Sequence, residues 1–213
     1  MEIEYVVSIR ISFSEKIAKI LKQEKDRFVS EYGSSLKSEP HITLYLDRYT
    51  QEGFLQLLQD LKKLQVSPFI ISLLKPEVRY EENHHRNLYV MDVFNKEQIR
   101  ELHAKISEIA IRYRSPLLRS KVRQRLEQQG IHTDGIRESS KDDNDAAEVF
   151  DPHITLGEVG IDASQPDLEK IRRNLKELEG EKITVSSIAV FFDGKKDGEE
   201  KFKSIERVSI PLS

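Results

Sequence analysis

The sequence predicts an α/β or α+β fold built from two similar lobes, and three observations lead to this prediction. Short β-branched segments alternate with longer segments in which apolar residues recur every three or four positions, as strands alternating with helices do. The order strand, helix, strand, helix, strand occurs twice along the 213 residues. A six-residue sequence also recurs, because residues 39–44 read EPHITL and residues 151–156 read DPHITL. An internal duplication explains all three observations together.

The first copy of this order extends from residue 5 to residue 74. Segment 5–11 is short and β-branched, segment 41–46 alternates, and segment 69–74 is almost entirely apolar, as expected of a buried strand. Two helices are predicted between these strands from apolar residues spaced three and four apart. The first helix carries Ile17, Ile20, Leu21 and Phe28, and the second carries Phe54, Leu57, Leu58, Leu61 and Leu64.

The second copy is predicted from the same kinds of pattern. Its strands, and a final strand that follows it, are expected at 87–94, 153–159, 183–192 and 205–212. Its first helix begins after Asn95, and Gln98 three residues later predicts a capping box. The apolar face of this helix carries Ile99, Leu102, Ile106 and Ile109. Its second helix is expected to start at a Ser164 cap and to end before Gly180, a residue suited to the left-handed conformation that closes helices.

One long segment interrupts the second copy. Residues 115–149 separate its first helix from its motif strand, whereas about ten residues do so in the first copy. The start of this segment has the pattern of a helix, and its polar remainder, 132–148, is predicted to be a mobile loop. We therefore predict a single bilobal domain over residues 1–213, with one repeat at 1–85 and the other at 86–213.

The composition excludes several classes of protein. Charged residues make up 33% of the chain and hydrophobic residues 38%, so an ionic surface and a buried core are both expected. A formal charge of −3 argues against a dedicated nucleic-acid scaffold, and no DNA partner is expected. No apolar segment has the length of a membrane span, so no membrane partner is expected. The absence of cysteine excludes disulfides, thiolate zinc sites and cysteine nucleophiles, and a cytoplasmic location is expected.

The repeated motif is predicted to place polar side chains on one face of each strand, because side chains alternate between the two faces. The polar faces are predicted to hold His41, Thr43 and Tyr45, and His153, Thr155 and Gly157. The core faces are predicted to hold Ile42, Leu44 and Leu46, and Ile154, Leu156 and Val159. If a pseudo-two-fold axis relates the lobes, the polar faces converge on one cleft.

Two imidazoles and two hydroxyls suit the chemistry of a phosphodiester. Histidine is the side chain that exchanges a proton near neutral pH, so one imidazole can act as base and the other as acid. The hydroxyls of Thr43 and Thr155 can hydrogen-bond the non-bridging phosphate oxygens. This chemistry requires no metal, and no cofactor is expected. A single strand histidine is usually structural, so it is the pair of motifs that predicts the function.

The two HITL motifs, at 41–44 and 153–156, resemble the hallmark of the 2H phosphoesterase superfamily. This superfamily includes the bacterial RNA 2′,3′-cyclic phosphodiesterases, also called 2′-5′ RNA ligases. The resemblance covers the layout of nearly the whole chain and implies an α+β, bilobal fold with antiparallel-rich sheets facing a central cleft. It implies metal-independent chemistry on 2′,3′-cyclic or 2′-5′ phosphodiesters. By this resemblance the catalytic and phosphate-binding roles fall on His41 and His153 and on Thr43 and Thr155.

Three further residues are predicted to bind the substrate around this centre. Tyr45 can stack on a base, and Tyr89 is expected to point either into the cleft or into the core. Arg86 precedes a strand, in a loop that can reach the cleft. The alternative for each is a structural role, as a rim tyrosine, a core tyrosine or part of an exposed polar turn.

Metal sites and an RNA groove are weaker hypotheses. The acidic run at 142–145 lacks the spacing, the glycine and the terminal glutamate of a calcium loop. A metal triad of His41, Asp151 and His153 leaves the paired threonines without a role. The basic stretch at 112–125 can guide an RNA tail, but a solvated helix face explains it as well.

These observations favour a phosphodiesterase whose partner is a nucleotide or the 3′ end of an RNA, and which is expected to be a monomer. The alternative is a nucleotide- or RNA-binding module that uses the same cleft without turnover. Trimming of RNA 3′ ends by attack of a ribose hydroxyl is a related activity of the same class. The pattern does not say which histidine is the base and which is the acid.

Overall fold

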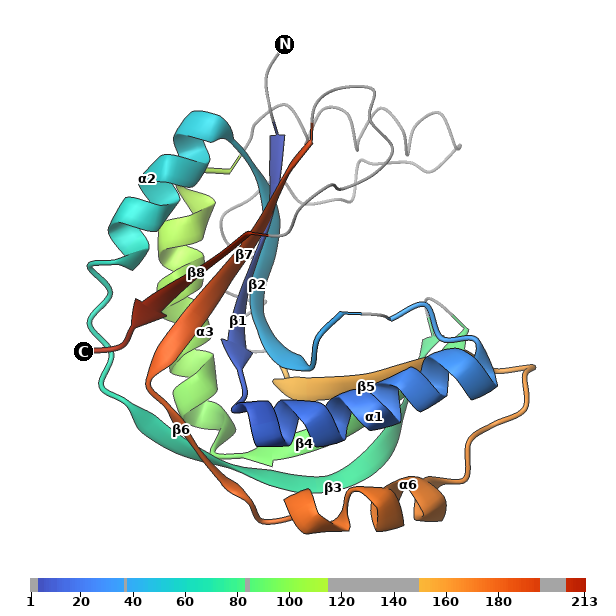
Figure 1. Ribbon diagram of the computed structural model, residues 1–213. Coiled ribbons are helices and arrows are strands. Elements are labelled where there is room, and N and C mark those ends of the chain that lie inside the picture. Colours follow the sequence, from blue (N-terminus) through green and yellow to red (C-terminus); the bar gives the residue numbers. More distant parts are fainter. Residues whose placement is uncertain (1–3, 37, 83–84, 115–149, 196–205) are drawn as a thin grey trace.

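Eight strands form one antiparallel sheet, and helices pack against it (Figure 1). The α+β class and the antiparallel sheet are therefore confirmed. The computed structural model of the protein describes residues 4–36, 38–82, 85–114, 150–195 and 206–213. The inserted segment at 115–149, with its expected helix, acidic run and most of its basic stretch, lies outside these residues. In the described part of the chain, no helix is long and apolar enough to cross a membrane.

The elements follow the predicted order. The first repeat holds β1 (Glu4–Ser12), α1 (Glu15–Tyr32), β2 (His41–Thr50), α2 (Gln51–Leu61) and β3 (Phe69–Glu81). The second holds β4 (Arg86–Phe94), α3 (Lys96–Ile111), β5 (His153–Gly160), α6 (Leu168–Asn174), the 3₁₀ turn η2 (Lys176–Leu178) and β6 (Lys182–Val185). The chain ends with β7 (Ser187–Lys195) and β8 (Glu206–Pro211).

One predicted helix cap and one predicted helix start are wrong: α3 begins after Asn95 as predicted but lacks the capping box, and α6 begins later than predicted. Asn95 adopts a left-handed conformation (φ 67°) and makes no side-chain cap, because its amide donates instead to the carbonyl of Ile70 at 2.9 Å. Helix α6 begins after Asp167 rather than Ser164, and the Asp167 carboxylate accepts from the amide of Glu169 at 2.9 Å. At α6, the Asp167 side chain takes the capping role that was expected of Ser164.

The sheet has the strand order β6-β3-β4-β5-β2-β1-β7-β8 and narrows at its centre. There, β2 and β5 share a single residue pair, Ile42 with Ile154. The predicted sheets of the two lobes are thus joined into one. Strand β3 of the first repeat pairs with β4, and β7 pairs with β1, so each half of the sheet contains strands from both halves of the sequence. The helices also cross over, because α1 packs on β5 and α3 packs on β2 (Figure 1).

The segment 183–192 is not the single strand that was predicted. The chain breaks at Ser186 into β6 and β7, whose partners β3 and β1 lie in opposite halves of the sheet. Both β6 and β7 are rich in β-forming residues. The amino-acid composition therefore does not indicate where the chain passes from one half of the sheet to the other.

Each HITL motif contains a β-bulge at the same place. The register of β2 against β1 shifts between Thr43 and Tyr45, and that of β5 against β4 shifts between Thr155 and Gly157. The leucine between each pair is the extra residue. A bulge reverses the alternation of faces beyond it, so histidine and threonine still share a face but the residues after them change sides.

The predicted positions of Gly157, Leu46 and Tyr45 are corrected by these bulges. Gly157 faces α1, where an added Cβ would lie 2.3 Å from the ring of Phe28. Leu46 was expected in the core but is 62% exposed, whereas Tyr45 is only 8% exposed. Gly157 therefore makes room for the ring of Phe28 on α1.

Candidate active site

The four residues predicted at the centre of the site line one cleft at the junction of β2 and β5. The cleft has a volume of about 620 Å³, and its walls include His41, Thr43, His153 and Thr155. The pairing of the two strands at the middle of the sheet brings the two motifs side by side. The cleft is also lined by an acidic residue, Asp151, and a basic residue, Lys25.

His41 is held through its Nδ1 atom, which lies 2.6 Å from the carbonyl oxygen of Glu39. A carbonyl only accepts hydrogen bonds, so Nδ1 is the donor and the neutral ring carries its lone pair on Nε2. Burial lowers the pKa of His41 to about 4, and the positive charge of Arg10 adds to the shift. His41 is therefore a neutral imidazole at neutral pH, with Nε2 able to accept a proton.

His153 is held by the same backbone contact, since its Nδ1 lies 2.8 Å from the carbonyl oxygen of Asp151. In addition, Nη1 of Arg79 lies 3.2 Å from the same nitrogen. Burial lowers the pKa of His153, and Arg79 lowers it as well, whereas the carboxylates of Asp151 and Asp92 act in the opposite direction. The two histidines thus share one geometry but differ in the charges around them.

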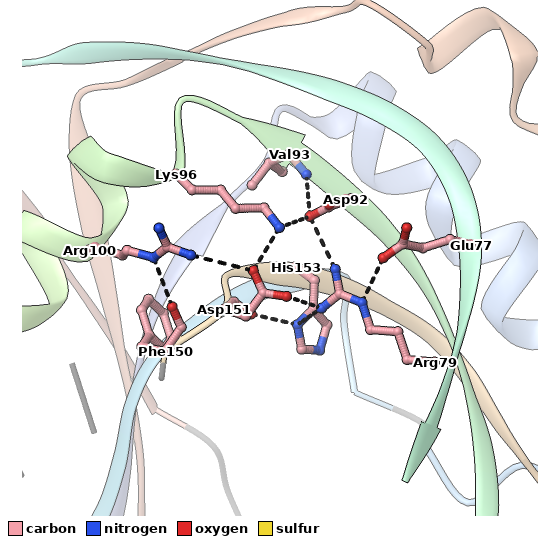
Figure 2. Close-up of polar contacts among 9 residues, drawn as sticks. All are labelled: Glu77, Arg79, Asp92, Val93, Lys96, Arg100, Phe150, Asp151 and His153. Carbon is pink, nitrogen blue, oxygen red and sulfur yellow. Dashed lines mark hydrogen bonds and ion pairs between the residues drawn. The ribbon is translucent and has the colours of Figure 1, made fainter. Parts of the chain in front are cut away.

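A network of charged side chains surrounds Arg79 beside His153 (Figure 2). The guanidinium contacts Glu77 at 2.7 Å, Asp92 at 3.3 Å and Asp151 at 2.5 Å. Lys96 of α3 bonds the last two carboxylates, at 2.7 and 2.6 Å. The network therefore joins β3, β4, α3 and the residues before β5 around one imidazole.

Neither Arg79 nor its partners Glu77 and Asp92 were predicted as site residues. The predicted strand stops at residue 74, where the apolar run gives way to Lys75 and Pro76, but β3 continues to Glu81. A register shift between Leu73 and Pro76 accommodates the proline. The alternation of charged Glu77, Arg79 and Glu81 beyond that shift was the available signal for a polar strand face.

Lys25 of α1 is a second cleft residue that the sequence analysis did not identify. It is 4% exposed, and its Nζ donates to the carbonyl of Thr155 at 3.0 Å. Burial lowers its pKa to about 8, and the charge of Arg10 adds to the shift. Lys25 lies on the apolar stripe of α1, four residues after Leu21 and three before Phe28, and this position was the signal for a buried lysine.

The three residues predicted around the centre have different surroundings. Tyr45 is among the residues that line the cleft, although the bulge buries its side chain, and its hydroxyl accepts from Nε of Arg114 at 2.8 Å. Tyr89 is 2% exposed and packs on Phe28 with ring centroids 5.0 Å apart. Arg86 binds two carboxylates, those of Glu81 and Glu158. The structure therefore brings Tyr45 to the cleft, and places Tyr89 and Arg86 outside the residues that line it.

The acidic and histidine side chains of the described ranges do not gather into a metal-binding group of three or more. Asp151, which was considered as a metal ligand beside the histidines, instead has its carboxylate bound by Arg79 and Lys96. In this cleft the carboxylate therefore serves an ion-pair network.

Comparisons with known proteins give structural matches alone, since no family model and no curated protein matches the sequence. A crystal structure described as a phosphoesterase has a TM-score of 0.53 at 12% identity, covering 97% of this chain and 99% of the other. E. coli LigT in its apo form has a TM-score of 0.54 at 11% identity, covering 98% and 99%. At such identities the similarity shows the fold. The chain therefore has the fold of the LigT and phosphoesterase structures, as its resemblance to the 2H phosphoesterases predicted.

Proposed function

We propose that this chain is a metal-independent phosphodiesterase that opens 2′,3′-cyclic phosphates or cleaves 2′-5′ phosphodiester bonds at nucleotide or RNA ends. The observation that carries the proposal is the meeting of His41 and His153 in one cleft, each with Nδ1 bonded to a backbone carbonyl. E. coli LigT, whose fold this chain has, is known in complexes with 3′-AMP, NADP⁺ and ATP. All three ligands are nucleotides, which supports a substrate of that class.

The reaction on a cyclic phosphate follows from the two Nε2 atoms. Nε2 of His41 accepts a proton from water while the water oxygen forms a bond to phosphorus. The bond from phosphorus to one ribose oxygen breaks, and protonated His153 donates its Nε2 proton to that leaving oxygen. Thr43 and Thr155 donate hydrogen bonds to the non-bridging oxygens, where charge grows. One water is consumed, one phosphomonoester forms, and proton exchange with solvent restores both rings.

The surrounding charges support this division of roles. Arg10 disfavours the imidazolium form of His41, which suits a base that must be neutral before the reaction. Burial and Arg79 lower the pKa of His153, and Asp151 and Asp92 partly offset this by favouring the imidazolium form, which suits an acid that must be protonated. The backbone contact at Nδ1 orients each ring, so that Nε2 remains for the proton transfer.

Turnover of 2′,3′-cyclic nucleotides and 2′-5′ dinucleotides, with EDTA present, tests the proposal. We expect wild-type turnover, and a loss of roughly 100-fold or more in kcat for His41→Gln and for His153→Gln, the usual range for removing a proton-transfer group. His85→Asn is the matched control, because His85 is exposed and outside the cleft, and asparagine tolerates its positive φ of 47°.

Two results would contradict the proposal. Activity that survives either cleft substitution would remove the two-histidine mechanism. Tight binding of a cyclic nucleotide with no turnover by the wild type would instead favour a binding module that uses the same cleft.

A further inference from the structure

Lys25 brings a buried positive charge to the cleft. Two other cations of this region are paired with carboxylates, since Lys22 pairs with Glu39 at 2.9 Å and Arg79 is surrounded by three carboxylates. Arg10, whose charge also lowers the pKa of Lys25, donates from Nε to the Ser8 hydroxyl at 2.7 Å. Among the described residues, no carboxylate lies within 4.0 Å of the Lys25 ammonium. Its one hydrogen-bond acceptor in that part of the chain is the Thr155 carbonyl, although an ammonium has three protons to donate.

In the other half of the sheet, a neutral side chain donates a hydrogen bond to a carbonyl of the motif strand. A carbonyl at this bulge therefore does not require a charged donor. There, His103 of α3 donates from Nδ1 to the carbonyl of Leu44 at 2.5 Å, in the bulge of β2 and one motif position beyond the residue that corresponds to Thr155. Burial lowers the pKa of His103, so this donor is a neutral ring at neutral pH. Each motif strand thus has a bulge carbonyl bonded by a helix of the other repeat, and a neutral group is sufficient in one case.

A buried ammonium without a carboxylate is costly, and an anion that enters the cleft removes that cost. We propose that Lys25 is a substrate-binding residue whose ammonium pairs with the phosphate group held between His41 and His153. This inference rests on the proposed function, since it assigns the phosphate to the same cleft. The Lys25 ammonium lies beside Thr155 at the cleft. A bound phosphate would therefore contact a cation from α1 and hydroxyl donors from the two motif strands.

Binding of inorganic phosphate to the full chain, measured by calorimetry, tests the assignment without requiring turnover. We expect Lys25→Gln to weaken phosphate affinity by about tenfold or more, and Lys25→Arg to retain most of it, as expected for a charge-assisted contact. Lys22→Gln is the matched control, since Lys22 lies on the same helix one turn earlier, is 44% exposed and pairs with Glu39. Thermal unfolding of each variant shows whether the fold is kept.

A second measurement uses the wild type, in case Lys25→Gln does not fold. In a lysine-labelled sample followed by NMR, phosphate should raise the pKa of Lys25, because an adjacent anion stabilises the ammonium. Unchanged phosphate affinity in folded Lys25→Gln, or an unchanged Lys25 titration on saturation with phosphate, would overturn the inference. These results are independent of the catalytic test. If the protein binds phosphate through Lys25 but hydrolyses no substrate, the role of Lys25 is supported and the proposed function is contradicted.

Discussion

At the scale of single residues, the two histidines share one orienting device. Each ring donates from Nδ1 to the carbonyl two residues earlier, across Pro40 or Pro152. Proline restricts the residue before it to extended conformations, so both strands enter the site with the same backbone path. The difference between the rings therefore comes from their neighbours: a cation adjoins each ring, Arg10 or Arg79, but only His153 also has carboxylates beside it that raise its pKa.

Arg79→Gln should change the pH dependence of the reaction. Both histidines have pKa values below 6.5, so the bell-shaped profile of kcat/KM in the wild type should be centred below pH 6.5. Removal of the guanidinium removes a positive charge and leaves Asp151 and Asp92 facing the ring, both of which raise the pKa of His153. The limb at higher pH, where the acid loses its proton, should therefore move to higher pH.

The profile of kcat/KM against pH, together with an NMR titration of His153, measures this shift. Arg112→Gln is the control, because Arg112 is exposed and pairs with Glu108 on the surface of α3. A profile that moves equally in both variants, or in neither, would show that Arg79 does not tune His153.

At the scale of elements, the matched bulges decide how helices approach the motif strands. In β5 the extra residue turns Gly157 toward α1, where Phe28 covers it. The site is thereby coupled to the packing of α1, the helix that also carries Lys25.

Gly157→Ala should destabilise the protein, because its Cβ would lie 2.3 Å from the Phe28 ring and the core would have to shift. Overpacking of this kind costs about 1–3 kcal/mol of unfolding free energy. Gly160→Ala, in the same strand, places its Cβ in open space and should change stability by less than about 0.5 kcal/mol. Chemical denaturation measures both. If Phe28→Leu does not relieve part of the Gly157→Ala penalty in the double variant, the clash is not the cause.

At the scale of the whole molecule, the buried histidines link stability to pH. The pKa values of His41, His103 and His153 are all lowered in the folded chain from the ordinary value of 6.5. Below pH 6.5 the unfolded chain therefore binds protons that the folded chain does not, and protonation favours unfolding. The free energy of unfolding should be highest above pH 6.5 and should fall as the pH decreases toward 4.

Denaturant unfolding at a series of pH values measures this dependence. His41→Gln should flatten the slope between pH 6.5 and 4, since it removes a group whose pKa is about 4 in the folded protein. His85→Asn, which changes an exposed histidine outside the cleft, is the matched control. A wild-type stability that is constant or rises over this range would contradict the burial argument.

Much of the fold and the centre of the site could be predicted from the sequence because the signals are local. The repeated HITL motif and the three- and four-residue spacing of apolar side chains need no long-range information. Arg79 could not be found in this way, because its strand continues past a proline and its partners Asp92 and Asp151 come from β4 and from the segment just before β5. Lys25 is similar, since its partner Thr155 is 130 residues away.

By itself, the sequence determined the alternation of strands and helices, the recurrence of the HITL motif, and the prediction of four residues that share one cleft, His41, Thr43, His153 and Thr155. Only the tertiary structure decided which half of the sheet each strand joins, where the bulges reverse the faces, and which charges adjoin each imidazole. The physical reason is the distance along the chain between the interacting residues. Spacing along a regular strand determines which side chains share a face, but strand pairing, burial and pKa depend on groups that only folding brings together.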